Sequence, residues 1–345
     1  MIKFKINNRI ISENHEPLII AEIGINHNGN LDSAISIVDS AIKAGAEIIK
    51  HQTHVIDDEM ANAAKKVIPG NSKKSIYQII NEMALSENDE KKLMNYIVNK
   101  KKIFFSSPFS RKAVDRLEKF GVPLYKIGSG ECNNYPFVEY ICKKKKPIIL
   151  STGMNTLKTI EPAVKIIRKY KLPYVLLHCT NVYPTPHKLV RLNAMLELKK
   201  KFNDAIIGLS DHSETIYTSL GAVSMGACVI EKHYVTTKKT KGPDVSSSMD
   251  FNELKELIKG SKIIYESKEG KKGPIKEEAK TIAFAFASVA AVKNIKKDEK
   301  LTSENIFPIR PSTGFYKVKD YKNLIGLRAN RNIEKGSQLK PADVK

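Results

Sequence analysis

Ala205-Ile206-Ile207-Gly208-Leu209-Ser210-Asp211-His212-Ser213 is an apolar, β-branched run that ends abruptly in a hydroxyl, a carboxylate and an imidazole. The pattern is typical of a buried strand that leads into a polar loop. It predicts a functional site where a sheet meets its loops, with Ser210 and His212 as candidates and with no role defined for Asp211. A lone histidine is more often a surface or hydrogen-bonded core residue than a ligand. Whether His212 is a ligand therefore depends on the residues that end the other predicted strands.

Seven further short apolar runs alternate with helical patterns along the chain. Together with residues 205–209, the predicted strands are 18–23, 47–50, 103–106, 124–127, 147–150, 174–178 and 228–231. The predicted helices have apolar residues three and four positions apart, and are 31–44, 87–99, 111–120, 157–170, 192–202, 214–225 and 252–266. Gly45, Gly121 and Gly226 are expected to close three of these helices.

This alternation predicts an α/β fold, a (β/α)8 TIM barrel of eight parallel strands linked by helices. Residues 3–6 and 9–12 add an N-terminal hairpin. An open doubly wound sheet is the competing architecture, but the first strand–helix turn, at 24–30, lacks the G-x-G-x-x-G phosphate loop of that fold.

Charged side chains stand within or directly beside several of the apolar runs. They are Glu22, Lys50, Lys126, Glu231 and His233. An unpaired charge in such a place costs several kcal/mol. We therefore expect these groups to meet at the carboxyl ends of the strands, where barrel enzymes carry their chemistry, and to neutralise one another or bind ligands of opposite sign.

Hydroxyl and amide groups accompany the two lysines at the strand ends. Lysine binds phosphate as a point charge, and hydroxyls add directional donors. The predicted anion cradle, for a phosphate and a carboxylate, consists of Lys50, Ser107, Lys126, Ser129, Ser151, Asn181 and Ser210. In the alternative interpretation, one or two of these serines only cap helices.

Two histidines follow neighbouring strands, His212 after the seventh and His233 after the eighth. Two imidazoles in a shell completed by water or substrate suit Mn, Fe, Co or Zn, and the residues do not choose among these metals. Glu22 and Glu131 are candidates for acid–base work or for orienting water.

Two loops offer groups for a polyhydroxy substrate. The loop at 54–75 is long, as lids and binding loops are, and its Pro69-Gly70-Asn71 turn would present Asn71. The eighth loop carries Asp244, after Gly242-Pro243, as a hydroxyl acceptor.

The composition excludes several classes of protein. The net charge of the 345 residues is +21, but only eight of the 58 basic residues are Arg, and the lysines are spread along the chain. Protein surfaces that bind nucleic acids interleave Arg with aromatic residues, so no nucleic-acid partner is expected.

Four cysteines without a C-x-x-C pair indicate reduced thiols. Without a signal peptide or an apolar segment of ~18 residues, a soluble cytoplasmic protein with no membrane partner is expected.

The composition changes after the eighth unit. A polar, glycine-containing run at 267–274 predicts a linker at 267–281, between a catalytic domain at 1–266 and a small domain at 282–345. Residues 294–306 are echoed by 332–344, with Asn, Ile, Lys and Leu at matching places. The echo predicts a small, pseudo-symmetric β fold.

Several motifs together resemble the sialic acid synthase family, that is N-acetylneuraminate synthase and its relatives for other nonulosonic acids. They are Ala21-Glu22-Ile23-Gly24-Ile25-Asn26-His27-Asn28-Gly29, Lys50-His51-Gln52-Thr53-His54, Lys126-Ile127-Gly128-Ser129-Gly130-Glu131, Ser151-Thr152-Gly153-Met154, Leu209-Ser210-Asp211-His212 and Glu231-Lys232-His233. The resemblance implies condensation of phosphoenolpyruvate with an N-acetylhexosamine such as N-acetylmannosamine, with release of phosphate by cleavage of the C–O bond. The second motif is more similar to the N-acetylneuraminate branch than to the legionaminic or pseudaminic acid branches, which are the alternative.

The resemblance also implies roles for single residues. His212 and His233 match ligands of a divalent metal, with Mn first and Mg or Co as alternatives. The anion cradle matches the groups around phosphoenolpyruvate, although Ser107 stands where the family usually has Thr. Glu22, Glu131 and Lys126 match catalytic groups. The groups matched to the sugar are Gln52, Asn71, Tyr183 and Asp244.

The small domain resembles the antifreeze-like (SAF, β-clip) domain that ends these synthases. In the family it reaches over the partner subunit's barrel in a domain-swapped homodimer, and Phe284 and Arg310 match residues near the sugar. Taken alone, Arg310 would be interpreted as a solvated loop cation.

Two other hypotheses stay open from the residues. One is another phosphoenolpyruvate-dependent sugar-condensing barrel, such as a 3-deoxy-octulosonate type enzyme, which the small domain and the paired histidines disfavour. The other is a carbohydrate-binding or nucleic-acid-binding protein without catalysis, which the intact Glu22, Lys126, His212 and His233 disfavour.

Overall fold

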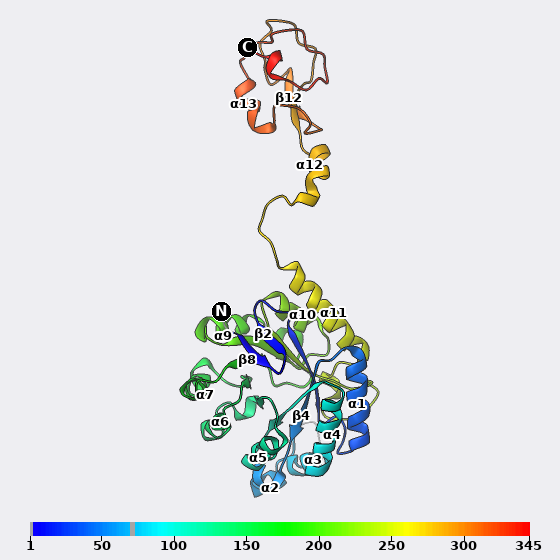
Figure 1. Ribbon diagram of the computed structural model, residues 1–345, viewed down its shortest axis with the longest axis vertical. Coiled ribbons are helices and arrows are strands. Elements are labelled where there is room, and N and C mark those ends of the chain that lie inside the picture. The colour runs from blue at the N-terminus through cyan, green and yellow to red at the C-terminus, as the bar shows by residue number, and fades with distance from the viewer. Residues whose placement is uncertain (1–2, 70–72) are drawn as a thin grey trace. The chain divides into compact units, whose positions relative to one another are not determined.

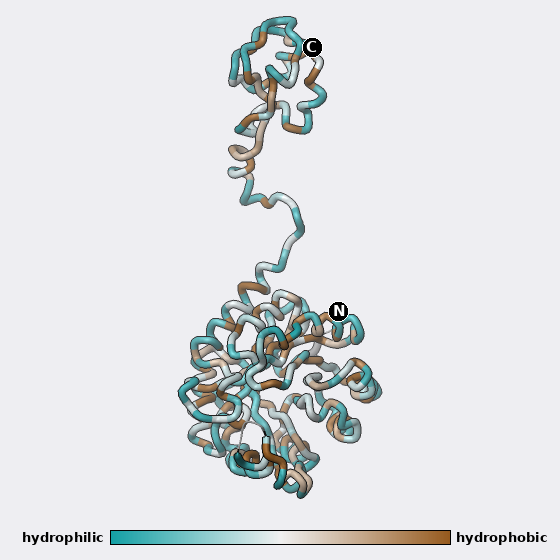
Figure 2. The backbone as a smooth tube through the Cα atoms, turned by 180° about the vertical axis from the view of Figure 1, so that it is seen from behind, coloured by the Kyte–Doolittle hydropathy of each residue, from teal (hydrophilic) through white to brown (hydrophobic). Residues whose placement is uncertain are grey.

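A computed structural model describes residues 3–69 and 73–345 of the chain, which divides into two compact units, Met1–Glu269 and Gly270–Lys345. The stretch that joins them is polar, with Lys271 and Lys272 at its centre, and has hydrophilic colours in Figure 2. Within the described ranges, no helix combines the length and the apolar character that a membrane crossing requires.

Eight parallel strands form the centre of the first unit (Figure 1). They are β3 (Leu18–Gly24), β4 (Ile48–Thr53), β5 (Ile103–Pro108), β6 (Tyr125–Ile127), β7 (Ile148–Ser151), β8 (Tyr174–Cys179), β9 (Ile206–Asp211) and β10 (Val229–His233). The hydrogen-bonded order is β5-β4-β3-β10-β9-β8-β7-β6, so the last strand pairs with the first, and β5 lies against β6. The predicted barrel is confirmed as a nearly closed ring that contains all eight predicted strands.

Helices surround the strands (Figure 1). They are α1 (Leu31–Ala44), α2 (Ile56–Glu59), α3 (Ile76–Met83), α4 (Glu87–Asn99), α5 (Arg111–Phe120), α6 (Tyr135–Cys142), α7 (Leu157–Lys169), α8 (His187–Val190), α9 (Asn193–Lys201), α10 (Tyr217–Ser224) and α11 (Phe251–Ser267). The seven predicted helices correspond to α1, α4, α5, α7, α9, α10 and α11, with ends that agree within three residues.

Glycine and proline mark the helix ends. Gly45, Gly121 and Gly226 have φ values of +110°, +73° and +102°, so all three are left-handed as predicted. Helix α6 was not predicted, because it has only eight residues and carries Pro136 in its first turn. Proline is tolerated there, since the first amides of a helix have no partner within the helix.

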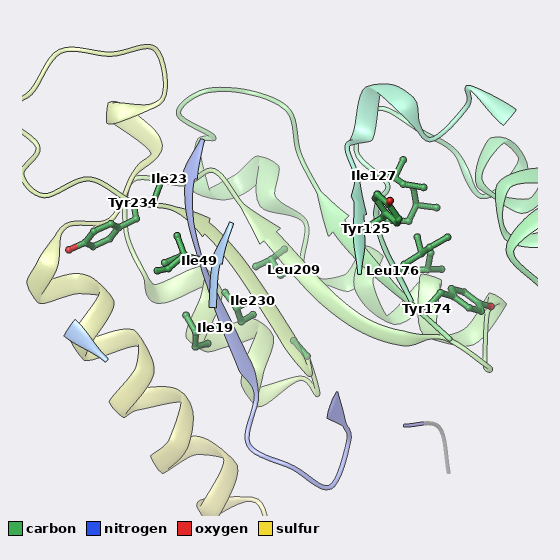
Figure 3. Close-up of a cluster of buried hydrophobic side chains, with 14 of the residues drawn as sticks. Ile19, Ile23, Ile49, Tyr125, Ile127, Tyr174, Leu176, Leu209, Ile230 and Tyr234 are labelled. Atoms are coloured by element: carbon green, nitrogen blue, oxygen red, sulfur yellow. The ribbon is translucent and has the colours of Figure 1, made fainter. Parts of the chain in front are cut away.

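The strands alternate between two apolar layers. Outward-facing residues such as Ile19, Ile49, Leu209 and Ile230 pack among the side chains that face the helices (Figure 3). Inward-facing residues fill the amino-terminal half of the barrel, and include Ile20, Ile48, Phe105, Ile149 and Leu177. This separation follows from the period of two in a strand.

The predicted N-terminal hairpin is present as β1 (Lys3–Ile6) and β2 (Arg9–Ser12). Ile6 and Ile11 are buried in the inward-facing apolar cluster. The hairpin therefore closes the amino-terminal end of the barrel with apolar side chains, and leaves the polar strand ends at the opposite, carboxyl end.

The second unit contains a structural repeat. Its elements are α12 (Ala279–Ala285), β11 (Ser288–Ala291), β12 (Ile306–Ile309) and α13 (Tyr321–Leu324). Ile295 and Ile333 exchange both backbone hydrogen bonds, at 2.9 and 2.8 Å. The Oδ1 of Asn294 accepts from the amide of Lys335, and the Oδ1 of Asn332 accepts from the amide of Lys297, both at 2.8 Å. These matched contacts confirm the predicted pseudo-symmetry of 294–306 and 332–344.

Candidate active site

A cavity of about 140 Å³ lies at the carboxyl ends of the barrel strands. Its lining contains all seven residues of the anion cradle, both candidate metal ligands, and Gln52 and Tyr183 from the set matched to the sugar. The other lining residues are Phe109, Gly128, Gly130, Cys179 and Glu231. Residues from seven of the eight strands and their loops thus converge on one small volume, as the barrel predicts.

Two lysines and two glutamates form a buried network at the bottom of the cavity. Lys50 pairs directly with Glu22, and its Nζ lies 3.8 Å from the Oε1 of Glu231. The Nζ of Lys126 lies 3.3 Å from the same Oε1 and donates to the Oγ of Ser151 at 2.8 Å. Glu22, Lys50, Lys126 and Glu231, four of the five charged groups that stand within or beside apolar runs, do meet and neutralise one another, as expected from the sequence.

Burial and mutual charge give the network unequal protonation. Burial raises the pKa of Glu22 to about 7, although Lys50 opposes the shift. Burial also acts to raise the pKa of Glu231, but Lys126 and Lys50 outweigh it and the pKa is lowered. Burial lowers the pKa of Lys126, which Glu231 compensates only in part. Glu22 is therefore the carboxyl that exchanges a proton near neutral pH, while Glu231 stays ionised.

Glu231 is the main site residue that the sequence did not select. It was recognised as a charge within an apolar run, but it was not placed among the groups around a ligand. Its position two residues before His233 was the available signal, because alternate residues of a strand face the same side. Cys179 and Phe109 also line the cavity without having been predicted.

The two histidines lie side by side, with ring centroids 5.5 Å apart. The Nδ1 of His212 lies 3.0 Å from the carbonyl oxygen of Thr180, which can only accept, so this nitrogen carries the proton and Nε2 has the free lone pair. The Nδ1 of His233 is buried and has no hydrogen-bond partner among the described residues. Burial lowers the pKa of His212 to about 4 and that of His233 to about 3, so both rings are neutral.

This pair fits a divalent metal. Neutral imidazoles with unused lone pairs are what such a cation binds. Across residues 3–69 and 73–345, no group of three or more His, Cys, Asp and Glu side chains is arranged to hold a metal. The two rings would therefore supply two ligands and leave the remaining positions to water or substrate.

Three predicted barrel residues within the described part of the chain are absent from the lining. Glu22 is buried beside Lys50, and Asp244 has its Oδ2 3.7 Å from the Nδ1 of His233. Glu131 accepts a hydrogen bond from the Nδ2 of Asn134 at 2.7 Å, within its own loop. Asn71 lies outside the described residues.

A glycine permits the close packing of the cradle. A Cβ on Gly153 would lie 1.8 Å from the Oδ1 of Asn181 and 2.9 Å from the Oγ of Ser129. The amide of Gly153 donates to that same Oγ at 3.1 Å. Any side chain at position 153 would displace two members of the cradle.

Residues between the site positions face the helices. His51 follows Lys50, and its Nδ1 lies 3.2 Å from the Oε1 of Glu90 on α4. Asp211, which the sequence left without a role, pairs with Lys232 behind β9 and β10. Strands β4, β9 and β10 therefore present functional groups inward and buried polar anchors outward.

Phe284 and Arg310 belong to the second unit, where both side chains are exposed. The amide of Ser312 donates to the carbonyl of Ala283 at 2.9 Å, which joins the end of α12 to the loop after β12. The two residues matched to the sugar thus lie in the same part of this unit.

The fold and the site define a barrel enzyme with a lysine-rich anion cradle and a histidine pair. Residues 37–272 match the model of the NeuB family, and residues 286–345 match that of the SAF domain. The chain belongs to the NeuB family and is an enzyme of that family. The predicted resemblance to the sialic acid synthases and the predicted SAF domain are confirmed.

Individual relatives agree with this assignment. The chain is 36% identical to N,N'-diacetyllegionaminic acid synthase of Campylobacter jejuni, over 94% of this chain and 98% of that one. It is 35% identical to a pseudaminic acid synthase of the same species, over 94% and 96% of the two chains. The crystal structure of N-acetylneuraminic acid (sialic acid) synthetase from Leptospira borgpetersenii is similar with a TM-score of 0.74 and 31% identity, and covers 81% of this chain and 95% of that one.

Proposed function

We propose that this protein condenses phosphoenolpyruvate with an N-acetylated amino sugar to form a nonulosonic acid of the legionaminic or pseudaminic type. The observation that carries the proposal is the cavity in which Lys50 and Lys126 lie among five hydroxyl and amide groups. The names of two similar relatives favour these acids. N-acetylneuraminate synthase, the first expectation from the Lys50-His51-Gln52-Thr53-His54 motif, becomes the second candidate.

The chemistry of the relatives' products distinguishes the candidate sugars. A product with two N-acetyl groups needs a sugar with two acetamido groups, because phosphoenolpyruvate contains no nitrogen. N-acetylmannosamine carries only one. The number of acetamido groups that the sugar requires is therefore the property that separates the two candidates.

In the proposed complex, Lys50 and Lys126 bind the phosphate and the carboxylate of phosphoenolpyruvate as point charges. The hydroxyls and the amide of the cradle orient these anions. Because Glu231 already contacts both ammonium groups, the arriving anion competes with a carboxylate that is held in place. The cradle therefore selects ligands whose charge exceeds that of a single carboxylate.

A divalent cation bound by His212 and His233, with Mn first and Mg or Co as alternatives, would supply Lewis-acid polarisation of the sugar aldehyde. The enol carbon of phosphoenolpyruvate attacks the aldehyde carbon, and a new C–C bond forms. Water adds to the resulting cationic carbon, and the C–O bond to phosphate breaks in the tetrahedral intermediate. One proton of the water passes through a base to the former aldehyde oxygen, which becomes a hydroxyl, and the other leaves with the departing phosphate.

Of the two predicted carboxylates, Glu22 is better suited to accept the proton of this water. It contacts Lys50 of the cradle, and its pKa of about 7 lets it take up and release a proton at neutral pH. Neither carboxylate lines the cavity, but Glu131 is bound by Asn134 of its own loop and makes no ion pair with a lysine of the cradle among the described residues. We assign Glu131 a role in shaping the loop that carries Ser129.

We also propose a homodimer in which the SAF domain of one subunit covers the barrel of the other. Exposed apolar side chains support it in both units. Met154 and Tyr217 lie in or beside loops at the carboxyl end of the barrel, and Phe284 and Phe315 lie in the second unit. Burial of such side chains against a second subunit would remove apolar surface from water, which favours association.

The test is release of phosphate from phosphoenolpyruvate in the presence of Mn²⁺ and one of two sugars, N-acetylmannosamine or a hexose with two acetamido groups. We expect release that depends on the diacetamido sugar. With ¹⁸O in the bridging position of phosphoenolpyruvate, the label is expected in the phosphate, because C–O cleavage leaves the bridging oxygen there. Release with N-acetylmannosamine alone would establish the second candidate, and no sugar-dependent release with either would refute the proposed activity.

A further inference from the structure

A buried ion pair lies directly behind the two histidines of the cavity. Asp211 precedes His212 on β9, Lys232 precedes His233 on β10, and the two charged residues are partners in the strand register. Both side chains are 0% exposed, and the Nζ of Lys232 lies 3.5 Å from the Oδ2 of Asp211. The pair therefore links, on the outer face of the barrel, the two strands that carry the imidazoles on the inner face.

The carboxylate of Asp211 is fully engaged. Its Oδ1 accepts from the amide of Ser213 at 2.8 Å, and its Oδ2 accepts from the hydroxyls of Thr218 and Ser219, both at 2.7 Å. These donors come from the turn after β9 and from α10. Asp211 thus fixes the turn that leaves the site and the helix that follows it.

The ammonium of Lys232 holds the backbone on both sides of His212. Its Nζ donates to the carbonyl of Ser213 at 2.5 Å and lies 3.5 Å from that of Asp211. Lys232 is itself the chain neighbour of His233. One ammonium group therefore ties the main chain around one imidazole to the main chain beside the other.

We propose that Lys232, together with Asp211, is a positioning residue that presets the separation and orientation of His212 and His233 for a divalent cation. The inference rests on the proposed function of this histidine pair. Stability alone does not account for the ion pair, because a buried pair can be replaced by uncharged groups of similar volume without loss of stability. Groups that orient metal ligands typically change metal affinity by about 10- to 100-fold when they are replaced.

The test compares the full chain with the charge-neutral double variant Asp211→Asn/Lys232→Met. Replacing both residues avoids the uncompensated buried charge that a single replacement would leave. Mn²⁺ binding is measured without substrates, from the electron paramagnetic resonance signal of free Mn²⁺. We expect the Kd for Mn²⁺ to rise about tenfold or more. The visible spectrum of bound Co²⁺ at saturation should change as well, because it reports ligand geometry rather than stability.

The matched control is Glu90→Gln, which removes an equally buried carboxylate behind a different site strand. It should leave the Kd for Mn²⁺ unchanged. A wild-type Kd and Co²⁺ spectrum in the double variant would overturn the inference. His212→Ala tests the underlying metal role separately, since unchanged Mn²⁺ binding in that variant would refute the metal site and the positioning role together.

A milder variant keeps the inference testable if the double variant does not fold. Thr218→Val/Ser219→Ala removes two hydrogen bonds to Asp211 and changes no charge. We expect the Kd for Mn²⁺ to rise at least threefold. A wild-type Kd in this variant would also overturn the positioning role.

Discussion

Lys126 and Glu231 lie 3.3 Å apart at the bottom of the cavity, and the same carboxylate oxygen is 3.8 Å from Lys50. One carboxylate thus counters two ammonium groups in a place that water reaches poorly. Such a network holds the lysines in position before any ligand binds. Each buried group is also stabilised in its charged form by the opposite charges beside it.

Lys126→Met should destabilise the barrel by about 3 kcal/mol, because it weakens the compensation of the buried Glu231. The double variant Lys126→Met/Glu231→Gln should recover at least half of this loss. Both are expected to lose measurable binding of inorganic phosphate. Urea denaturation followed by circular dichroism, with phosphate titration by calorimetry, measures the two effects. Equal stability of the single and double variants would contradict the coupling.

Gly153→Ala should weaken phosphate binding at least tenfold and destabilise the fold by about 1–3 kcal/mol, because the added methyl group collides with Asn181 and Ser129. Gly273→Ala is the control, since a Cβ there meets no atom within 4 Å among the described residues and Gly273 does not line the cavity. Calorimetric titration with phosphate compares the two variants. Similar affinities would show that Asn181 does not contribute to the cradle.

Glu90 gives the fold a defined dependence on pH. Burial acts to raise its pKa, but hydrogen bonds from His51 and Thr53 and the charge of Arg116 outweigh burial, and the pKa is lowered. A carboxyl of this kind contributes stability above its unfolded pKa, about 4.3, and the contribution is lost as the pH falls through the lower, folded value. Glu90→Gln should therefore lower the free energy of unfolding at pH 7 by about 1–3 kcal/mol. The difference from the wild type should shrink below pH 4, as measured by urea denaturation at each pH, and a constant difference would refute this assignment.

Arg310→Ala should raise the KM for the sugar more than the KM for phosphoenolpyruvate, if the SAF domain contributes to the sugar site as proposed. The side chain is exposed in its own unit, so the change should leave the stability of that unit nearly unaltered. Lys317→Ala is a poorer comparison, because the Nζ of Lys317 already binds the carbonyl of Ser312. Lys319→Ala, another cation of the same unit, serves as the control. A larger effect on the KM for phosphoenolpyruvate would place Arg310 elsewhere.

The sequence predicts the barrel because its strands are buried on both faces and read as continuous apolar runs. The anion cradle was predictable for a related reason, since a lysine inside such a run must meet an opposite charge or a ligand. The position of a residue along a strand predicts which side of the sheet its side chain faces, but it does not predict which residue the side chain contacts there. For this reason Glu231 was seen as a charge and missed as a site residue, and Glu131 was expected at the cavity although its loop turns it toward Asn134.

Asp211 is a second residue whose contacts could not be predicted from the sequence, and it lies on the helix-facing side of the sheet. It stands between two cavity residues in the sequence, and its polar character suggested nothing about the helix face. Its role becomes clear from Lys232 on the neighbouring strand and from the hydroxyls of Thr218 and Ser219, which α10 brings from seven and eight positions further along the chain.

The hairpin that closes the amino-terminal end of the barrel also affects the order in which substrates bind and products leave. With Ile6 and Ile11 closing that end, a ligand leaves by the opening through which it came. Lys50 and Lys126 are 3% exposed at the bottom, whereas Tyr183 near the opening is 39% exposed. For the proposed reaction we therefore expect phosphoenolpyruvate to bind before the bulkier sugar and the released phosphate to leave after the sugar product, because Ile6 and Ile11 close the other end of the barrel.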